Sequence, residues 1–229
     1  MRYFEVAATS SVQATPGGAA PAPRGVCIRI VIGDGLGQHN WDDPGFKDWG
    51  AKWGALMSWL IGLEHFRSSL KIGPGGETGP VNDMVRHASE RLGANIMGRR
   101  MFEAGERGWP EEVPFHTPVF VLTHRPRPSI EMEGGTTFHF LNASPAEALK
   151  TAREAAVGQD TRLGGGPSVV RDFLAEGLVD HMHLVQVPIV LGRGVRLWDG
   201  LESLEEAYNI EAVSTPSGVT HLTFTAKGR

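Results

Sequence analysis

The chain has 229 residues, of which 41% are hydrophobic and 21% charged, and its formal net charge is −4. These values are typical of a globular protein with a sizeable core, and the slightly acidic balance gives no reason to expect nucleic acid as a partner. The single cysteine excludes an internal disulfide and fits a reducing compartment. No apolar run is long enough for a membrane span or a signal peptide, so we expect a cytoplasmic protein that does not enter a membrane.

The first part of the chain combines short strand-like runs with long loops. Residues 1–9 (MRYFEVAAT) and the β-branched run at residues 26–32 (VCIRIVI) are typical of strands. Between them, residues 10–25 form a flexible loop rich in proline, alanine and glycine. Residues 33–50 contain glycine, aspartate and tryptophan without a period, which indicates a long loop of the kind that often carries function.

Helical spacing begins after residue 50. Apolar side chains recur three and four positions apart from Trp53 to Phe66, which predicts an amphipathic helix. Residues 71–80 (KIGPGGETGP) form another loop. A second helix is predicted to begin at Asn82, whose side chain suits an N-cap, and to end at Gly93.

Strands and helices then alternate through the rest of the chain. Strand-like runs occupy residues 94–97, 118–123, 136–141, 161–163 and 179–187, and a final hairpin pairs residues 209–213 with 219–225. Ser144 and Glu147 form a capping box, with Pro145 at the first position of a helix that ends near Val157. This alternation predicts one α/β domain over residues 1–229. Its central sheet is mainly parallel, with helices on both faces and a C-terminal antiparallel hairpin.

One stretch combines a strand, a glycine turn and a helix start. Gly164, Gly165 and Gly166 follow the strand at residues 161–163, and Pro167 suits the first helical position. Ser168 and Val169 continue this helix, and Gly177 closes it as a left-handed cap. Backbone N–H groups at such a helix start favour a phosphate, although similar turns also occur in α/β proteins without a ligand.

Two other strands have basic exits. Gly98, Arg99 and Arg100 follow one strand, and Thr123, His124 and Arg125 follow another. Ligands of open α/β sheets bind outside the carboxyl ends of the strands. If the three exits lie side by side, glycine amides and guanidinium groups converge on one polyphosphate. Arginine suits the extra ribose phosphate of NADP.

These segments also carry a resemblance. GRRMF at residues 98–102, VFVLT at residues 119–123 and GGGPSVVRDFLAEGLVDHMHLVQVPIVLGRGVRLW at residues 164–198 resemble the dihydrofolate reductase-like family. They are most similar to the C-terminal reductase domain of bifunctional riboflavin-biosynthesis enzymes and its stand-alone bacterial relatives. The resemblance covers about residues 53–224. It implies a dihydrofolate reductase-like fold, NADPH as hydride donor, a small-molecule substrate and a homodimer.

The resemblance also implies roles for individual residues in cofactor binding. Gly98, Arg99 and Arg100 would flank the pyrophosphate, and Thr123 and Arg125 would hold the adenosine 2′-phosphate. The phosphates would be cradled by Gly164, Gly165, Gly166, Pro167, Ser168 and Val169. The expected activity is hydride transfer to a small carbonyl, imine or pterin-like molecule bound beside the helix from Trp53 to Phe66.

The N-terminal segment departs from this family pattern. Relatives carry Ser-x-Asp-Gly after their first strand, whereas Ser10 to Ala14 contain neither an acid nor a glycine. This departure keeps open a nucleotide-binding or regulatory protein of the same fold that has lost turnover, and no catalytic residue is assigned. His181 and His183 lie two apart on one strand, but no third ligand has a suitable spacing, so no metal site is predicted. A zinc hydrolase is the third alternative.

Overall fold

The structure is a computed structural model of the chain, and it describes residues 26–32, 36–37, 62–69, 71, 73–106, 109, 111–190, 195–214 and 218–228. The predictions for residues 1–25, for most of the loop at residues 33–50 and for the helix before residue 62 lie outside these residues. Within this described part, no helix has both the length and the apolar character needed to cross a membrane.

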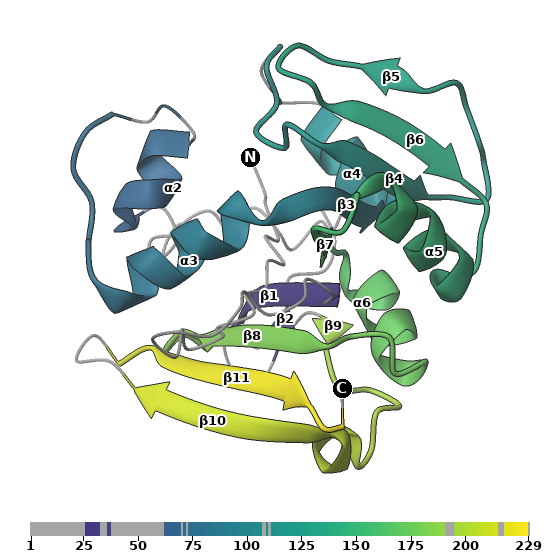
Figure 1. Cartoon of the computed structure of the whole chain (residues 1–229). Coiled ribbons are helices and arrows are strands. Elements are labelled where there is room, and N and C mark those ends of the chain that lie inside the picture. Colours follow the sequence, from purple (N-terminus) through teal and green to yellow (C-terminus); the bar gives the residue numbers. More distant parts are fainter. Residues whose placement is uncertain are drawn as a thin grey trace.

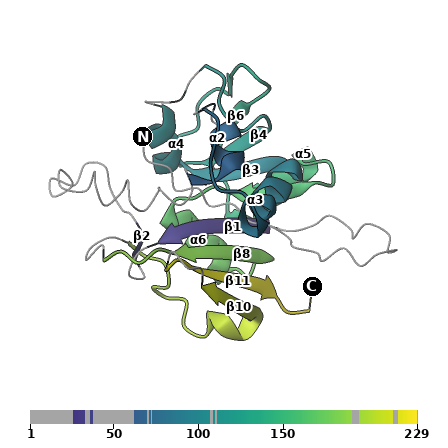
Figure 2. The same ribbon diagram turned by 90° about the vertical axis from the view of Figure 1, so that its left-hand side faces the viewer.

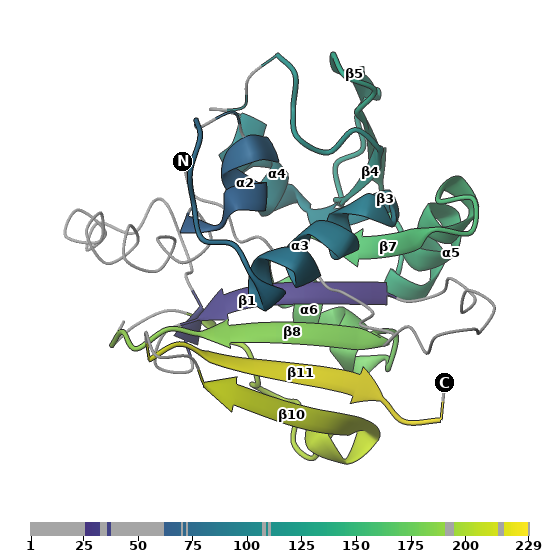
Figure 3. The same ribbon diagram turned by 60° about the vertical axis from the view of Figure 1, so that its left-hand side comes forward.

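A mainly parallel sheet organises the described residues into nine strands. Its edge-to-edge order is β10, β11, β8, β1, β7, β3, β4, β6 and β5 (Figure 3, with β6 labelled in Figure 1). The six central strands run parallel and are β8 (His181–Gln186), β1 (Val26–Ile32), β7 (Asp160–Leu163), β3 (Leu92–Gly98), β4 (Pro118–Leu122) and β6 (Thr137–Leu141). The uninterrupted apolar run of β4 (PVFVL) fits a strand that is covered on both faces of a parallel sheet.

Antiparallel strands occupy the two edges. One edge is the C-terminal hairpin of β10 (Tyr208–Ser214) and β11 (Thr220–Ala226), which Figure 2 shows at the bottom of the sheet. The other edge is β5 (Ile130–Glu131), which pairs with β6. A separate two-stranded ladder joins β2 (Leu36–Gly37) to β9 (Val195–Arg196). The predicted C-terminal hairpin is therefore confirmed, whereas β5 was not predicted.

Five α-helices and one 3-10 helix are described around the sheet. They are α2 (Glu64–Ser69), α3 (Pro80–Glu90), α4 (Arg99–Glu106), α5 (Pro145–Ala155), α6 (Pro167–Ala175) and η2 (Leu204–Ala207). In Figure 1, α2 and α3 lie on the left, and α5 and α6 lie on the right. The predicted capping box at Ser144 and Glu147 is present, with Pro145 at the first helical position.

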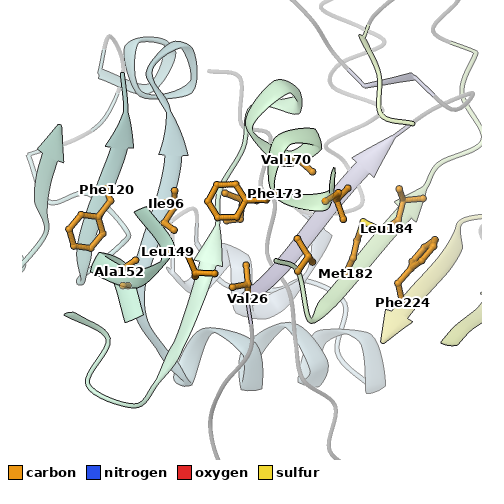
Figure 4. Packing of buried hydrophobic residues seen from close by; sticks show 14 of the residues in the cluster. Val26, Ile96, Phe120, Leu149, Ala152, Val170, Phe173, Met182, Leu184 and Phe224 are labelled. Atoms are coloured by element: carbon orange, nitrogen blue, oxygen red, sulfur yellow. The ribbon is translucent and has the colours of Figure 1, made fainter. Parts of the chain in front are cut away.

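Two apolar clusters lie on opposite faces of the sheet. Phe173 of α6 and Leu149 of α5 pack against Ile96 of β3 in the larger cluster (Figure 4). Phe102 of α4 packs against Met97 of β3 in the smaller one. Because neighbouring residues of a strand point to opposite faces, α4 covers one face while α5 and α6 cover the other.

The start and the end of α3 differ from the prediction. The N-cap is Gly79, and Pro80 occupies the first helical position because its missing N–H is not needed there. Asn82 lies within the first turn, and its Oδ1 accepts a hydrogen bond from the backbone N–H of His65 at 2.8 Å. Gly93 does not end this helix but lies in β3, where an added Cβ would meet Ala156 O at 2.4 Å. Close packing against the end of α5 therefore requires the glycine.

Candidate functional site

The three polar strand exits lie side by side. Strands β7, β3 and β4 are consecutive neighbours in the sheet and run parallel. Their carboxyl ends therefore meet at one edge, where Gly98 ends β3 and Gly164 and Thr123 directly follow β7 and β4. The sequence analysis required the three strand exits to be neighbours, and the sheet order shows that they are.

A reversal of the chain connections lies between two of these strands. Strand β3 leads into α4 on one face of the sheet, and its neighbour β7 leads into α6 on the other. Neighbouring strands whose helices leave to opposite faces open a crevice at their carboxyl ends. This switch point between the carboxyl ends of β3 and β7, called the crevice below, is thus the position where open α/β sheets bind ligands.

Main-chain hydrogen bonds join the end of β3 to the glycine turn after β7. Gly98 N donates to Gly165 O, and Gly164 N donates to Ile96 O, each at 2.6 Å. The peptide bond between Gly165 and Gly166 is cis. These two hydrogen bonds fix the glycine turn after β7 against the end of β3.

Gly98, Gly165 and Gly166 differ in whether, and why, the described structure requires glycine at their position. An added Cβ on Gly98 would lie 2.8 Å from Val169 Cγ2, so close packing of β3 against α6 requires glycine there. Gly165 has φ of +97°, which glycine tolerates and other residues rarely adopt. Gly166 has φ of −76°, and an added Cβ would meet no atom of the described residues within 4 Å. This described part of the chain does not require glycine at position 166 and leaves the space in front of it open.

Helix α6 presents its N-terminus to this open space. Gly166 is the N-cap and makes no side-chain cap hydrogen bond, while Pro167 occupies the first helical position. The first hydrogen bond of the helix runs from Val170 N to Gly166 O at 3.1 Å. The backbone N–H groups of Ser168 and Val169 precede it, and such groups favour an anion.

The arginines of the two basic exits differ in their partners. Arg99 Nη1 pairs with Glu103 Oε1 at 2.6 Å along α4. Arg100 and Arg125 are exposed, and no ion pair holds either guanidinium within the described part of the chain. Exposed, unpaired guanidinium groups at neighbouring strand ends suit a multiply charged phosphate ligand.

Thr123 shapes the second basic exit. It is buried, and its backbone N–H donates to Leu141 O at 2.8 Å. Its Oγ1 accepts a hydrogen bond from Arg125 N at 3.0 Å. This side chain therefore sets the turn that carries Arg125.

The histidines of β8 do not form a metal site with other described residues. No group of three or more His, Cys, Asp or Glu side chains in the described ranges is arranged to hold a metal. His183 Nε2 lies 3.0 Å from His221 Nδ1 of β11, and both rings are buried. Burial lowers the pKa of His181, against the opposing effect of Asp180 and Asp160. The partner His221 was missed because only the antiparallel register of β8 and β11 brings it near.

A buried polar pair lies beneath the crevice. Arg162 of β7 donates through Nε to Asn95 Oδ1 of β3 at 2.6 Å, and Asn95 Nδ2 donates to Thr117 Oγ1 at 2.6 Å. The guanidinium carbon lies 5.8 Å from the ring centroid of Phe115. Asn95 therefore supplies the acceptor that a charged residue needs within a sheet.

Sheet order and crossover pattern define a mixed α/β fold with a mainly parallel central sheet and a C-terminal antiparallel hairpin, as the sequence predicts. A model of the RibD C-terminal domain family matches residues 67–222, which is more than half of the 229 residues. The chain belongs to the RibD C-terminal domain family.

Three solved structures are similar to this chain. A putative riboflavin biosynthesis protein from Shewanella sp. PV-4 is 22% identical, with 70% of this chain and 87% of that chain covered and a TM-score of 0.49. A pyrimidine reductase-like protein from Corynebacterium diphtheriae is 15% identical, with 66% and 83% covered and a TM-score of 0.44. A dihydrofolate reductase from Enterococcus faecalis, complexed with NADP(H), is 15% identical, with 74% and 90% covered and a TM-score of 0.41. No curated protein matches the chain.

Proposed function

We propose that the protein is an NADPH-dependent reductase that transfers a hydride to a small organic substrate. One observation carries the proposal. The N-terminus of α6, whose N-cap Gly166 has no side chain, faces space that the described residues leave open, and Arg100 and Arg125, which form no ion pair with those residues, lie at the ends of neighbouring strands. Membership of the RibD C-terminal domain family supports a reductase role. The single cysteine supports a reducing compartment, and we place the reductase in the cytoplasm on that ground.

The residues at the crevice fit such a cofactor. The N–H groups of Ser168 and Val169 would bind the pyrophosphate, and a side chain at position 166 would fill the space that it needs. Arg99 and Arg100 would neutralise the same group. The remaining residues of the proposed site are Gly98, Gly164, Gly165 and Pro167, which shape the turn.

The second basic exit would distinguish NADPH from NADH. Thr123 and Arg125 would hold the adenosine 2′-phosphate, which NADH lacks. An arginine guanidinium binds such a phosphate by paired, charge-assisted hydrogen bonds. The bound cofactor supplies the hydride, and the protein orients it and excludes water.

The substrate that we propose is a small carbonyl, imine or pterin-like molecule. Most of the residues expected beside it, from Trp53 to residue 61, lie outside the described residues. Asp34, Asp42, Asp43 and Glu64 are the candidate proton donors, and of these only Glu64 is described: it lies in α2 and accepts a weak hydrogen bond from Asn82 Nδ2 at 3.5 Å. Oxidation of NADPH with a panel of these substrate classes tests the proposal. Tight NADPH binding without turnover on any of them would favour the binding or regulatory alternative.

We also propose a homodimer, on the ground of the family resemblance. The apolar run at residues 184–191 and the final hairpin are the candidates for its surface, and within that run Leu184 and Val185 are buried in the protein's own core whereas Val190 is exposed. The exposed edge strand β10 remains available, with Ile210 and Val213 on its surface. Light scattering at micromolar concentration tests this proposal, and a monomer there would contradict it.

A further inference from the structure

One side chain fastens the loop that carries Thr123 and Arg125. Residues 123–129 connect β4 to β5, and near their middle Arg127 reaches back to α4. Arg127 Nη2 lies 2.5 Å from Glu106 Oε1 in the last turn of that helix. The loop is thus tied to a helix that begins at the neighbouring strand exit.

Two aromatic rings hold the same guanidinium. Its carbon lies 4.9 Å from the ring centroid of Phe102 and 4.4 Å from that of Phe140. These rings pack edge to face, with their centroids 5.0 Å apart, and Phe102 is only 2% exposed. A planar guanidinium stacks on such rings, whereas a lysine ammonium reproduces the charge without the planar contact.

Helix α4 connects the two basic exits through this contact. Its first residues are Arg99 and Arg100, at the end of β3, and its last residue is Glu106. Arg127 therefore places the loop after β4 at a fixed position relative to the helix that begins after β3. The guanidinium itself is engaged with Glu106 and the two rings, whereas Arg125 on the same loop is unpaired within the described residues.

We propose that Arg127 is a positioning residue that sets the preference of this protein for NADPH over NADH. It holds the loop so that Thr123 and Arg125 face the adenosine 2′-phosphate, and it does not itself bind that phosphate. This inference rests on the proposed function. It adds that selectivity depends on an ion pair and an aromatic contact outside the cofactor site.

The variant Glu106→Gln gives the sharpest test of whether Arg127 positions the loop or binds the phosphate itself. The two possibilities predict different changes in NADPH affinity. If Arg127 bound the phosphate directly, removal of the competing carboxylate would leave NADPH binding unchanged or make it tighter. If Arg127 positions the loop, loss of the ion pair loosens Arg125. NADPH should then bind about tenfold more weakly, the value of one charge-assisted hydrogen bond, while NADH binding stays unchanged.

Arg127→Lys provides the second variant. Lysine keeps the positive charge but loses the contact of the planar guanidinium with the rings of Phe102 and Phe140. We therefore expect the same loss of selectivity for NADPH without a change in NADH affinity. The matched control is Glu112→Gln, which breaks the ion pair with Lys71 at a carboxylate of similar exposure, 44% against 43% for Glu106. This control should leave both dissociation constants unchanged.

Equilibrium titration of each variant with NADPH and with NADH, together with the melting temperature of the free protein, decides between the accounts. Selective loss of NADPH affinity in both variants, at a near-normal melting temperature, supports the positioning role. Wild-type selectivity in either variant, or tighter NADPH binding in Glu106→Gln, would overturn it while leaving the proposed function intact. A wild-type protein without any NADPH preference would overturn this inference together with the assignment of Thr123 and Arg125, whereas the reductase proposal itself would fail only if neither cofactor bound.

Discussion

The backbone N–H of Gly98 donates a hydrogen bond to the carbonyl oxygen of Gly165 across 2.6 Å. This bond joins the end of β3 to the glycine turn after β7, so the two sides of the crevice are held together by main-chain atoms. The first turn of α6 lies directly over the contact, with Val169 Cγ2 2.8 Å from the position that a Cβ on Gly98 would take. Glycine at position 98 is thus a packing requirement.

The variant Gly98→Ala should therefore push α6 away from β3. Overpacking of this kind costs about 1–3 kcal/mol of unfolding free energy. Urea unfolding measures the loss. The double variant Gly98→Ala with Val169→Ala removes the clashing methyl group and should recover most of it. A double variant no more stable than Gly98→Ala would show that the contact with Val169 is not the cause.

Gly166→Val should separate cofactor binding from folding. Position 166 has an ordinary φ of −76°, and none of the described residues lies within 4 Å of an added Cβ, so we expect a near-normal melting temperature for the free protein. The valine side chain would occupy the space in front of α6, and stabilisation by NADPH should be lost. Thermal shift with and without NADPH measures both effects. Retained stabilisation would place the phosphate elsewhere.

Gly165→Val is the matched comparison one residue earlier. Here φ is +97°, a conformation that a β-branched residue rarely adopts. We expect strain of about 1–3 kcal/mol whether or not a ligand is bound. The free protein should therefore melt at a lower temperature. Equal melting temperatures for the two valine variants would contradict the different reasons assigned to these glycines.

The pH dependence of stability should include a contribution from His181. Burial lowers the pKa of this histidine from its ordinary value of 6.5, so below that pH the unfolded chain binds more protons than the folded one. The free energy of unfolding should then fall as the pH drops below 6.5 towards the lower, folded-state pKa. His181→Gln should reduce this fall. Urea midpoints at about pH 7.5 and about pH 5 measure it, and an equal fall in both proteins would contradict the assignment.

Local signals predicted most elements well. The strand at Val26–Ile32, the capping box before α5 and the start of α6 at Pro167 all follow from neighbouring residues. Asn82 shows the limit of the same reasoning. Two possible starts of α3 lie close together, and Gly79 with Pro80 begins the helix while the Asn82 amide binds His65 from α2.

Contacts between distant segments could not be predicted in this way. Arg162 is a charged residue buried within a strand, and its acceptor Asn95 lies 67 positions earlier in the chain. The contacts of Arg127 with Glu106 and Phe140 likewise depend on how β4, β6 and α4 pack together. Residue spacing suggested the three strand exits as a site, but only the sheet order shows that they are neighbours.

Titration of the wild-type protein with NADPH and with NADH tests the central claim most directly. A ligand present at a hundred times its dissociation constant adds about 2.7 kcal/mol of stability, so the two cofactors can also be compared by thermal shift. We expect NADPH to bind with the lower dissociation constant and to give the larger shift, because Arg125 can contact a 2′-phosphate that NADH lacks. Equal binding of the two cofactors would contradict the assignment of Thr123 and Arg125, and no binding of either would contradict the reductase account.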